Sequence, residues 1–210
     1  MLLPIGDNIE RKTIPILPGV LVFLNLAVFA REIRFFVENP ENPRMIIEFI
    51  ETWGLVPTDL ENGRLVGLVT HMFLHGGIMH IVGNMLVLWA FACSLEIGLG
   101  KAYLLAFYLA WGVAAGALHA FMEWGSDTPL VGASGAIAGL MGAYTVLYGA
   151  DSKIKTLLFI GPKPFVIHVP AALYGVGWFG LQVYSARVEA SAGIDGGGAW
   201  WPHVGGGHAG

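Results

Sequence analysis

The chain has 210 residues, of which 55% are hydrophobic and 12% are charged, and its mean hydropathy is +0.66. Soluble domains carry about 25% charged residues, so this composition is typical of a membrane protein. The net charge is −4 and no basic patch is visible, which argues against a nucleic-acid partner. The single cysteine, Cys93, excludes an intramolecular disulfide.

Residues 1–13 are mixed in polarity and lack the features of a cleaved signal peptide, so we predict a short N-terminal segment outside the membrane. Residues 14–210 are predicted to form a transmembrane domain. A spanning helix needs roughly 20 mostly apolar residues. Five segments meet this requirement and a sixth begins near the C-terminus: Ile14–Phe36, Met79–Ile97, Ala102–Met122, Leu130–Ala150, Phe165–Tyr184 and Trp200–Gly210. The sixth is long enough for about half a bilayer. The predicted fold is therefore an all-α polytopic membrane protein whose sixth helix is truncated in this chain.

The connection between the first two spans, Glu38–Leu68, is longer than an ordinary loop and is therefore a candidate functional element. Lysine and arginine in short loops indicate the cytoplasmic side of a membrane protein. In this chain those residues gather before span one, between spans two and three, and between spans four and five: Arg11, Lys12, Lys101, Lys153, Lys155 and Lys163. The pattern predicts a cytoplasmic N-terminus, with spans two, four and six starting at the outer face.

Polar residues that could support catalysis stand at the starts of these same three spans. His80 and Asn84 begin the second, Ser134 begins the fourth, and His203 begins the sixth. A serine hydroxyl becomes a nucleophile when a histidine accepts its proton, and the oxyanion formed on the substrate needs hydrogen-bond donors. Ser134 and His203 are thus a candidate catalytic dyad. His80, Asn84 and the backbone N–H of Ser134 are candidate oxyanion donors, at a site opening toward the outer face.

Glycines next to these residues predict close helix packing. Gly132, Gly135 and Gly139 lie around and after Ser134, and Gly206 follows His203. Small residues spaced four apart let transmembrane helices approach closely. We therefore expect the fourth and sixth spans to pack together, which would bring Ser134 to His203.

These residues give the chain a resemblance to the rhomboid family of intramembrane serine proteases, from about Leu65 to the end. The family's GxSG motif reads Gly132-Ala133-Ser134-Gly135, and its helix-six motif begins His203-Val204-Gly205-Gly206. Its helix-two pattern covers residues 71–84, with histidines at 71, 75 and 80 and Asn84 at the end. Each motif alone is weak, but the three in order on separate spans are specific. The resemblance implies a rhomboid-like six-helix bundle with Ser134 as nucleophile and His203 as base.

Two positions depart from the family's pattern. Members often carry Trp-Arg in the long first loop, where this chain has Val66-Gly67. Some members place an aromatic residue four positions after the serine, where this chain has Ala138. His71 and His75 are expected to have structural roles in the first loop, and contact with substrate is the alternative.

The resemblance implies an endopeptidase that cleaves peptide bonds in or near transmembrane segments of client membrane proteins. The partners are then those clients and the lipid bilayer, and no metal or other cofactor is required. A client helix must unwind locally, because a hydrogen-bonded helix shields its carbonyl groups. The glycine-rich segment Ala192–Gly198, with the fifth span, is a candidate gate for water and substrate. The oligomeric state is not predicted.

Alternative functions fit the residues less well. A metalloprotease would need a glutamate between His71 and His75, as in HExxH, and none is present. A soluble hydrolase elbow would need glycine at Ala136. A transporter would be expected to carry ionisable residues at mid-membrane, and Glu96, near the end of a span, is thin support for one. The best alternative is a catalytically inactive rhomboid-like protein that binds membrane clients, although such a protein would normally lack the serine or the histidine.

Overall fold

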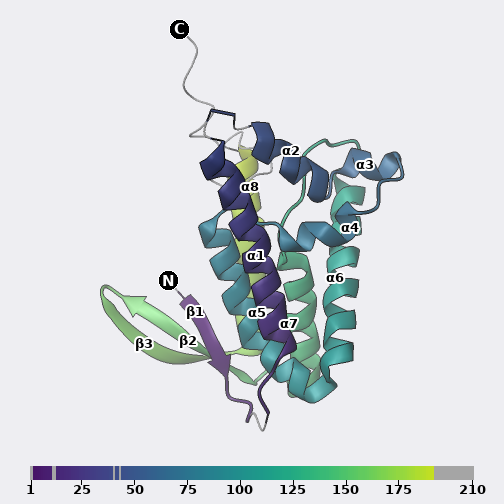
Figure 1. Cartoon of the computed structure of the whole chain (residues 1–210). Coiled ribbons are helices and arrows are strands. Elements are labelled where there is room, and N and C mark those ends of the chain that lie inside the picture. Colours follow the sequence, from purple (N-terminus) through teal and green to yellow (C-terminus); the bar gives the residue numbers. More distant parts are fainter. Residues whose placement is uncertain (1, 11–12, 40, 43, 192–210) are drawn as a thin grey trace.

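The computed structural model describes residues 2–10, 13–39, 41–42 and 44–191 (Figure 1). Two predicted features, the sixth span with His203 and Gly206 and the gate segment Ala192–Gly198, lie outside the described residues.

In the described part of the chain, five long helices form a bundle, and shorter helices cover one end of it (Figure 1). The long helices are α1 (Leu17–Glu38), α5 (Ile78–Leu99), α6 (Lys101–Met122), α7 (Ser134–Tyr148) and α8 (Ala171–Ser191). The short ones are α2 (Arg44–Trp53), α3 (Pro57–Glu61), α4 (Gly67–Thr70) and the 3₁₀ turn η1 (His71–Phe73). These short helices make up most of the long connection that the sequence predicted between the first two spans.

Two of the described helices, α5 and α6, are long and apolar enough to cross a membrane. The next predicted span contains α7, an apolar helix of 15 residues. The first predicted span contains most of α1, whose second half carries the charged residues Arg31, Glu32 and Arg34.

The core is centred on α5, which packs against α1, α6 and α7. Side chains on all sides of α5 are buried, because other elements of the fold surround this helix. The largest fully buried side chains of the core come from α1, α5, α6, α7 and the 3₁₀ turn: Leu21, Met72, Ile81, Leu88, Phe91, Leu95, Leu104, Tyr108 and Tyr144.

A buried carboxylate fixes the start of α1 against α5. Glu96, near the end of α5, accepts hydrogen bonds from the backbone N–H groups of Ile16 (3.0 Å) and Leu17 (2.7 Å). The first N–H groups of a helix have no partner within the helix, and a negative charge there is favourable. Glu96 therefore sets where α1 begins, next to the turn at Gly100 that joins α5 to α6.

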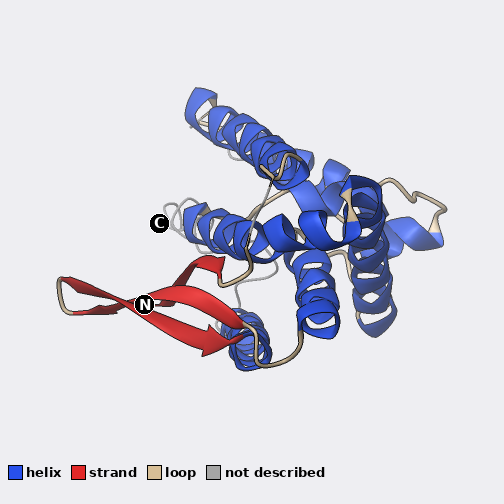
Figure 2. Cartoon of the chain, turned by 90° about the horizontal axis from the view of Figure 1, so that it is seen from below, coloured by secondary structure: helices blue, strands red, loops and turns tan. Residues whose placement is uncertain are grey.

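The short helices lie at one end of the bundle, and a three-stranded antiparallel sheet projects from the other end (Figures 1 and 2). Its strands are β1 (Leu2–Asp7), β2 (Lys153–Ile160) and β3 (Lys163–Pro170), in the order β1-β2-β3. The all-α prediction missed this sheet, although the chain is mostly helical.

The sheet also corrects the predicted fifth span, which began at Phe165. Residues 163–170 form β3, and α8 begins only at Ala171. Hydropathy does not distinguish an apolar strand from part of a spanning helix. The turn at Gly161, with a φ of +60°, lets β3 fold back along β2 with Leu158 opposite Phe165.

The N-terminal segment packs onto the bundle through β1. Asp7, at the end of β1, is buried and accepts a hydrogen bond of 3.0 Å from the hydroxyl of Tyr144 on α7. The side chain of Asn8 accepts a hydrogen bond from the N–H of Lys153 at the start of β2. The first strand therefore ties the sheet to the helices.

Candidate active site

Ser134 is the first residue of α7 and is half-buried at the end of the bundle that carries the short helices. The residue two positions earlier, Gly132, has a φ of +120°, which side-chain-bearing residues rarely adopt. The N–H of Gly132 donates a hydrogen bond of 2.8 Å to the carbonyl of His71. The chain thus turns sharply against the 3₁₀ turn just before the helix that presents the serine.

His80 and Ser134 both lie close to Gly132. A β-carbon placed on Gly132 would lie 2.9 Å from both Cε1 and Nε2 of His80 and 3.9 Å from Oγ of Ser134. Only a glycine therefore allows the His80 ring, from the first turn of α5, to lie against the chain that leads into Ser134. The structure brings together two of the residues that the sequence placed in one site, 54 positions apart.

Asn84 lies one turn further along α5 and is 3% exposed. Its amide nitrogen donates a hydrogen bond of 3.0 Å to the backbone carbonyl of His80. The amide carries a second N–H, and its Oδ1 has no partner among the described residues. In this arrangement Asn84 holds the backbone of His80, and one of its N–H groups remains available to another acceptor.

A second histidine, His75, supports His80 from behind. The two rings meet edge to face with their centroids 5.2 Å apart. His75 is 2% exposed, and within the described part of the chain neither of its ring nitrogens has a hydrogen-bond partner. Burial lowers the pKa of His75 to about 3, so its imidazole is neutral at physiological pH.

The backbone of His75 is held by Glu32 on α1. The N–H of His75 donates to the two carboxylate oxygens of Glu32 at 3.2 and 3.4 Å, and Glu32 is 4% exposed. Sequence reasoning missed Glu32. The available signal was an acidic residue inside a predicted span, which is a mark of function or of a fixed partner.

His71 has a structural role, as predicted. Its Nδ1 donates to the carbonyl of Gly67 at 2.8 Å, and its carbonyl accepts the N–H of Gly132. Burial also lowers the pKa of His71. This residue therefore joins α4 to the turn that precedes Ser134.

Gly67 stands where family members often carry the arginine of the Trp-Arg pair, and the packing around it explains this departure. A β-carbon on Gly67 would lie 2.5 Å from the carbonyl oxygen of Gly54 and 2.9 Å from Cα of Leu55. Leu55 in turn forms a β-bridge with Leu130. An arginine at position 67 cannot fit unless these backbones separate, so this loop is anchored by backbone contact instead.

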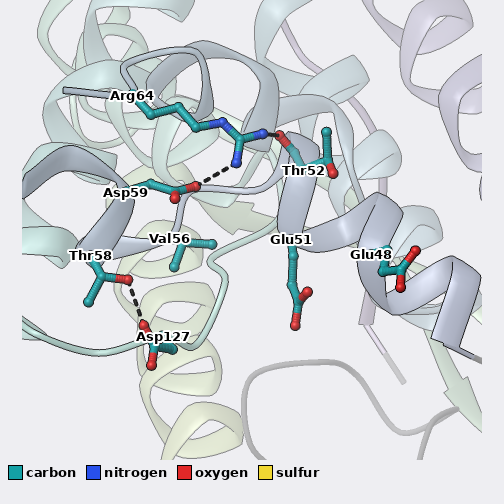
Figure 3. A pocket seen from close by; sticks show the side chains of 8 residues that line it. All are labelled: Glu48, Glu51, Thr52, Val56, Thr58, Asp59, Arg64 and Asp127. Carbon is teal, nitrogen blue, oxygen red and sulfur yellow. Dashed lines mark hydrogen bonds and ion pairs between the residues drawn. The ribbon is translucent and has the colours of Figure 1, made fainter. Parts of the chain in front are cut away.

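The same region contains a cavity of about 540 Å³ between the long connection and the loop before α7 (Figure 3). Thr58 donates a hydrogen bond of 2.6 Å to Asp127, and Arg64 forms an ion pair of 2.9 Å with Asp59. The Thr58–Asp127 bond ties α3 to the loop that leads into Gly132 and Ser134, and the Arg64–Asp59 pair ties α3 to the chain that follows it. Among the described residues, no group of three His, Cys, Asp or Glu side chains could hold a metal ion.

The glycines after Ser134 pack against α6. A β-carbon on Gly135 would lie 2.4 Å from Cβ of Ala115, and one on Gly139 would lie 2.1 Å from Cγ of Trp111. Their expected contact with the sixth span, and the expected approach of His203 to Ser134, involve residues outside those described.

Comparison with known proteins identifies the family. The Rhomboid domain matches residues 62–210 of this chain. The chain is 36% identical over 151 residues to rhomboid protease GluP of Bacillus subtilis. This alignment covers 71% of this chain and 29% of that protein. The chain is 40% identical over 83 residues to the putative rhomboid protease YdcA of the same organism, covering 40% of this chain and 41% of that protein. It is 31% identical over 137 residues to mitochondrial Rhomboid protein 1 of Saccharomyces cerevisiae, covering 62% of this chain and 37% of that protein.

This chain therefore belongs to the rhomboid family, and it is a membrane protein with candidate spans in α5 and α6. The resemblance drawn from the three motifs is confirmed. The aligned part spans less than half the length of each of these three relatives. Comparison with solved structures finds no significant match.

Proposed function

We propose that this protein is an intramembrane serine endopeptidase that cleaves peptide bonds in or near transmembrane segments of client membrane proteins. The observation that carries the proposal is that the His80 ring and the Ser134 hydroxyl both lie within 4 Å of the point where a β-carbon on Gly132 would stand. Family membership supports it, because relatives of this chain are named rhomboid proteases.

In the proposed reaction, Oγ of Ser134 attacks the carbonyl carbon of the scissile peptide bond while His203 accepts the hydroxyl proton. The carbonyl oxygen becomes negatively charged and accepts hydrogen bonds from His80, from the free N–H of Asn84 and from the backbone N–H of Ser134. His203 then donates its proton to the leaving amine, and water hydrolyses the acyl-enzyme. The neutral His75 ring keeps His80 in place without adding a charge beside the oxyanion.

The proposed orientation has a cytoplasmic N-terminus and a site opening toward the outer face. Three lysines at the sheet end of the bundle support this orientation, because positive residues gather on the cytoplasmic side: Lys153, Lys155 and Lys163. Clients would then be cleaved near their outer membrane boundary, at a segment that can unwind.

A fluorophosphonate probe tests the proposal, because it reacts covalently with an activated serine. We would label the protein in membranes alongside Ser134→Ala, His203→Ala and the control Ser152→Ala, which removes a serine just beyond the other end of α7. We expect native and Ser152→Ala proteins to be labelled, and the other two not. Equal labelling of all four would refute the dyad. A folded protein that is never labelled would favour a client-binding rhomboid without activity.

A further inference from the structure

Strands β2 and β3 form a hairpin that leaves the bundle sideways, at the end remote from Ser134 (Figures 1 and 2). It follows the end of α7 at Tyr148 and leads directly into α8 at Ala171, whose N–H donates to the carbonyl of Ser152 at 2.7 Å. Ser134 stands at the other end of α7, about 22 Å away at 1.5 Å per residue. The hairpin is therefore fixed to the helix ends on the face of the molecule opposite the candidate active site.

The outer half of this hairpin, residues 157–167, which we term the distal hairpin, is apolar on both faces apart from Lys163 beside its turn. Leu158 pairs with Phe165, and Leu157 pairs with Val166, so these two pairs lie on opposite faces of the ribbon. Phe165 is 46% exposed, Val166 is 55% exposed and Ile160, beside the turn, is 62% exposed. An antiparallel ribbon in water normally has one polar face. Neither face of the distal hairpin provides one.

Lysines flank the apolar part on both sides along the chain. Lys153 and Lys155 are exposed near the base of the hairpin, and Lys163 is exposed at its turn. Apolar side chains bordered by lysines match the boundary between lipid tails and anionic headgroups, where the charged amine reaches the headgroup and its carbon chain lies along apolar surface. The base of the hairpin is already joined to the helix ends, which reach that boundary in a membrane protein.

A second copy of the chain fits this surface less well. The outer edge of β3 would be the edge for strand pairing, but it carries Pro164 and Pro170, which have no N–H to donate, and Lys163. Edge prolines and lysines oppose the addition of another strand.

We propose that the distal hairpin inserts into the interfacial layer of the membrane leaflet opposite the Ser134 end, with Lys155 and Lys163 contacting anionic lipid headgroups. The anchor would hold the end of α7 and the start of α8 at a fixed depth. It does not depend on the proposed protease activity.

Site-specific quenching tests the insertion. In a Cys93→Ala background, Phe165→Cys and the control Asp151→Cys would each carry an environment-sensitive fluorophore, in vesicles of phosphatidylcholine with a quarter phosphatidylglycerol. We expect nitroxide-labelled lipids to quench position 165 several-fold more than position 151, and aqueous iodide to do the reverse. Equal iodide quenching at the two positions would overturn the proposal. Protection of position 165 that disappears when the protein is diluted in lipid would assign the surface to a second copy and would also overturn it.

The charge contribution is tested in the same assay. Adding phosphatidylglycerol to pure phosphatidylcholine vesicles should increase lipid quenching at position 165. The double variant Lys155→Glu/Lys163→Glu should lose this increase, whereas Lys101→Glu, at the start of α6, should keep it. An increase that survives in the double variant would refute the headgroup contact.

Discussion

Replacement of Gly132 by alanine tests the geometry of the site most directly. The new β-carbon would lie 2.9 Å from Cε1 and Nε2 of His80. Carbon atoms in favourable contact are about 3.5–4.0 Å apart, so the ring must move by roughly 0.6 Å or more. The φ of +120° adds backbone strain of about 1–3 kcal/mol.

The expected loss of activity follows from what His80 does in the proposed reaction. Removing one oxyanion donor costs about 10²–10³-fold in kcat, and displacing a catalytic group by an ångström costs about 10²-fold. We therefore expect Gly132→Ala to lower the rate of fluorophosphonate labelling about 100-fold. The matched control is Gly83→Ala on the same helix turn as His80, because among the described residues no atom outside its own helix backbone lies within 4 Å of its added β-carbon.

A double variant separates displacement of His80 from general damage. If the β-carbon acts through His80, then Gly132→Ala combined with His80→Ala should label no more slowly than His80→Ala alone, because the two changes share one cause. Thermal unfolding in detergent would show that each variant is folded. A folded Gly132→Ala protein that labels within threefold of the native rate would refute the reasoning.

Three further predictions concern stability. Glu96→Gln should lower the free energy of unfolding by about 1–3 kcal/mol, because a charged acceptor for the first N–H groups of α1 is lost; an unchanged denaturation midpoint in detergent would contradict this. Gly112→Ala places a β-carbon 1.7 Å from Sδ of the buried Met72 and should destabilise by about 1–3 kcal/mol, whereas Gly142→Ala, whose added β-carbon meets no neighbour among the described residues, should not. Because burial lowers the pKa of His75 from 6.5 to about 3, the unfolded state binds more protons between those values, so stability should fall as pH drops from 6.5 toward 3. Unfolding measured at pH 5 and 7.5 should show a smaller pH effect in His75→Asn, and an unchanged effect would assign the pH dependence to other groups.

The sequence by itself determined the membrane class, the family and the residues of the candidate site. Apolar run length and polarity are local properties, and the motif around Ser134 and the one running from His71 to Asn84 are each contiguous. The convergence of His80 and Ser134 could also be predicted, since helices that cross a membrane in alternate directions place every second start at the same face.

Only the tertiary structure decided how that site is built. The His80 ring fills the space that a side chain at position 132 would need, and Glu32 meets the backbone of His75 from 43 residues away. The space at Gly67 is filled by the backbone of Gly54, which no local pattern indicates.

The same limit explains the error in the predicted fifth span. Hydropathy records how apolar a segment is, but not whether its N–H groups bond within the segment or to a neighbour. Residues 163–170 are apolar enough for a helix, yet they pair with 153–160, which pair in turn with β1 at the far end of the chain. The pairing of β3 with β2 joins residues 3 to 17 positions apart, whereas the pairing of β2 with β1 joins residues about 150 positions apart, which only folding brings together.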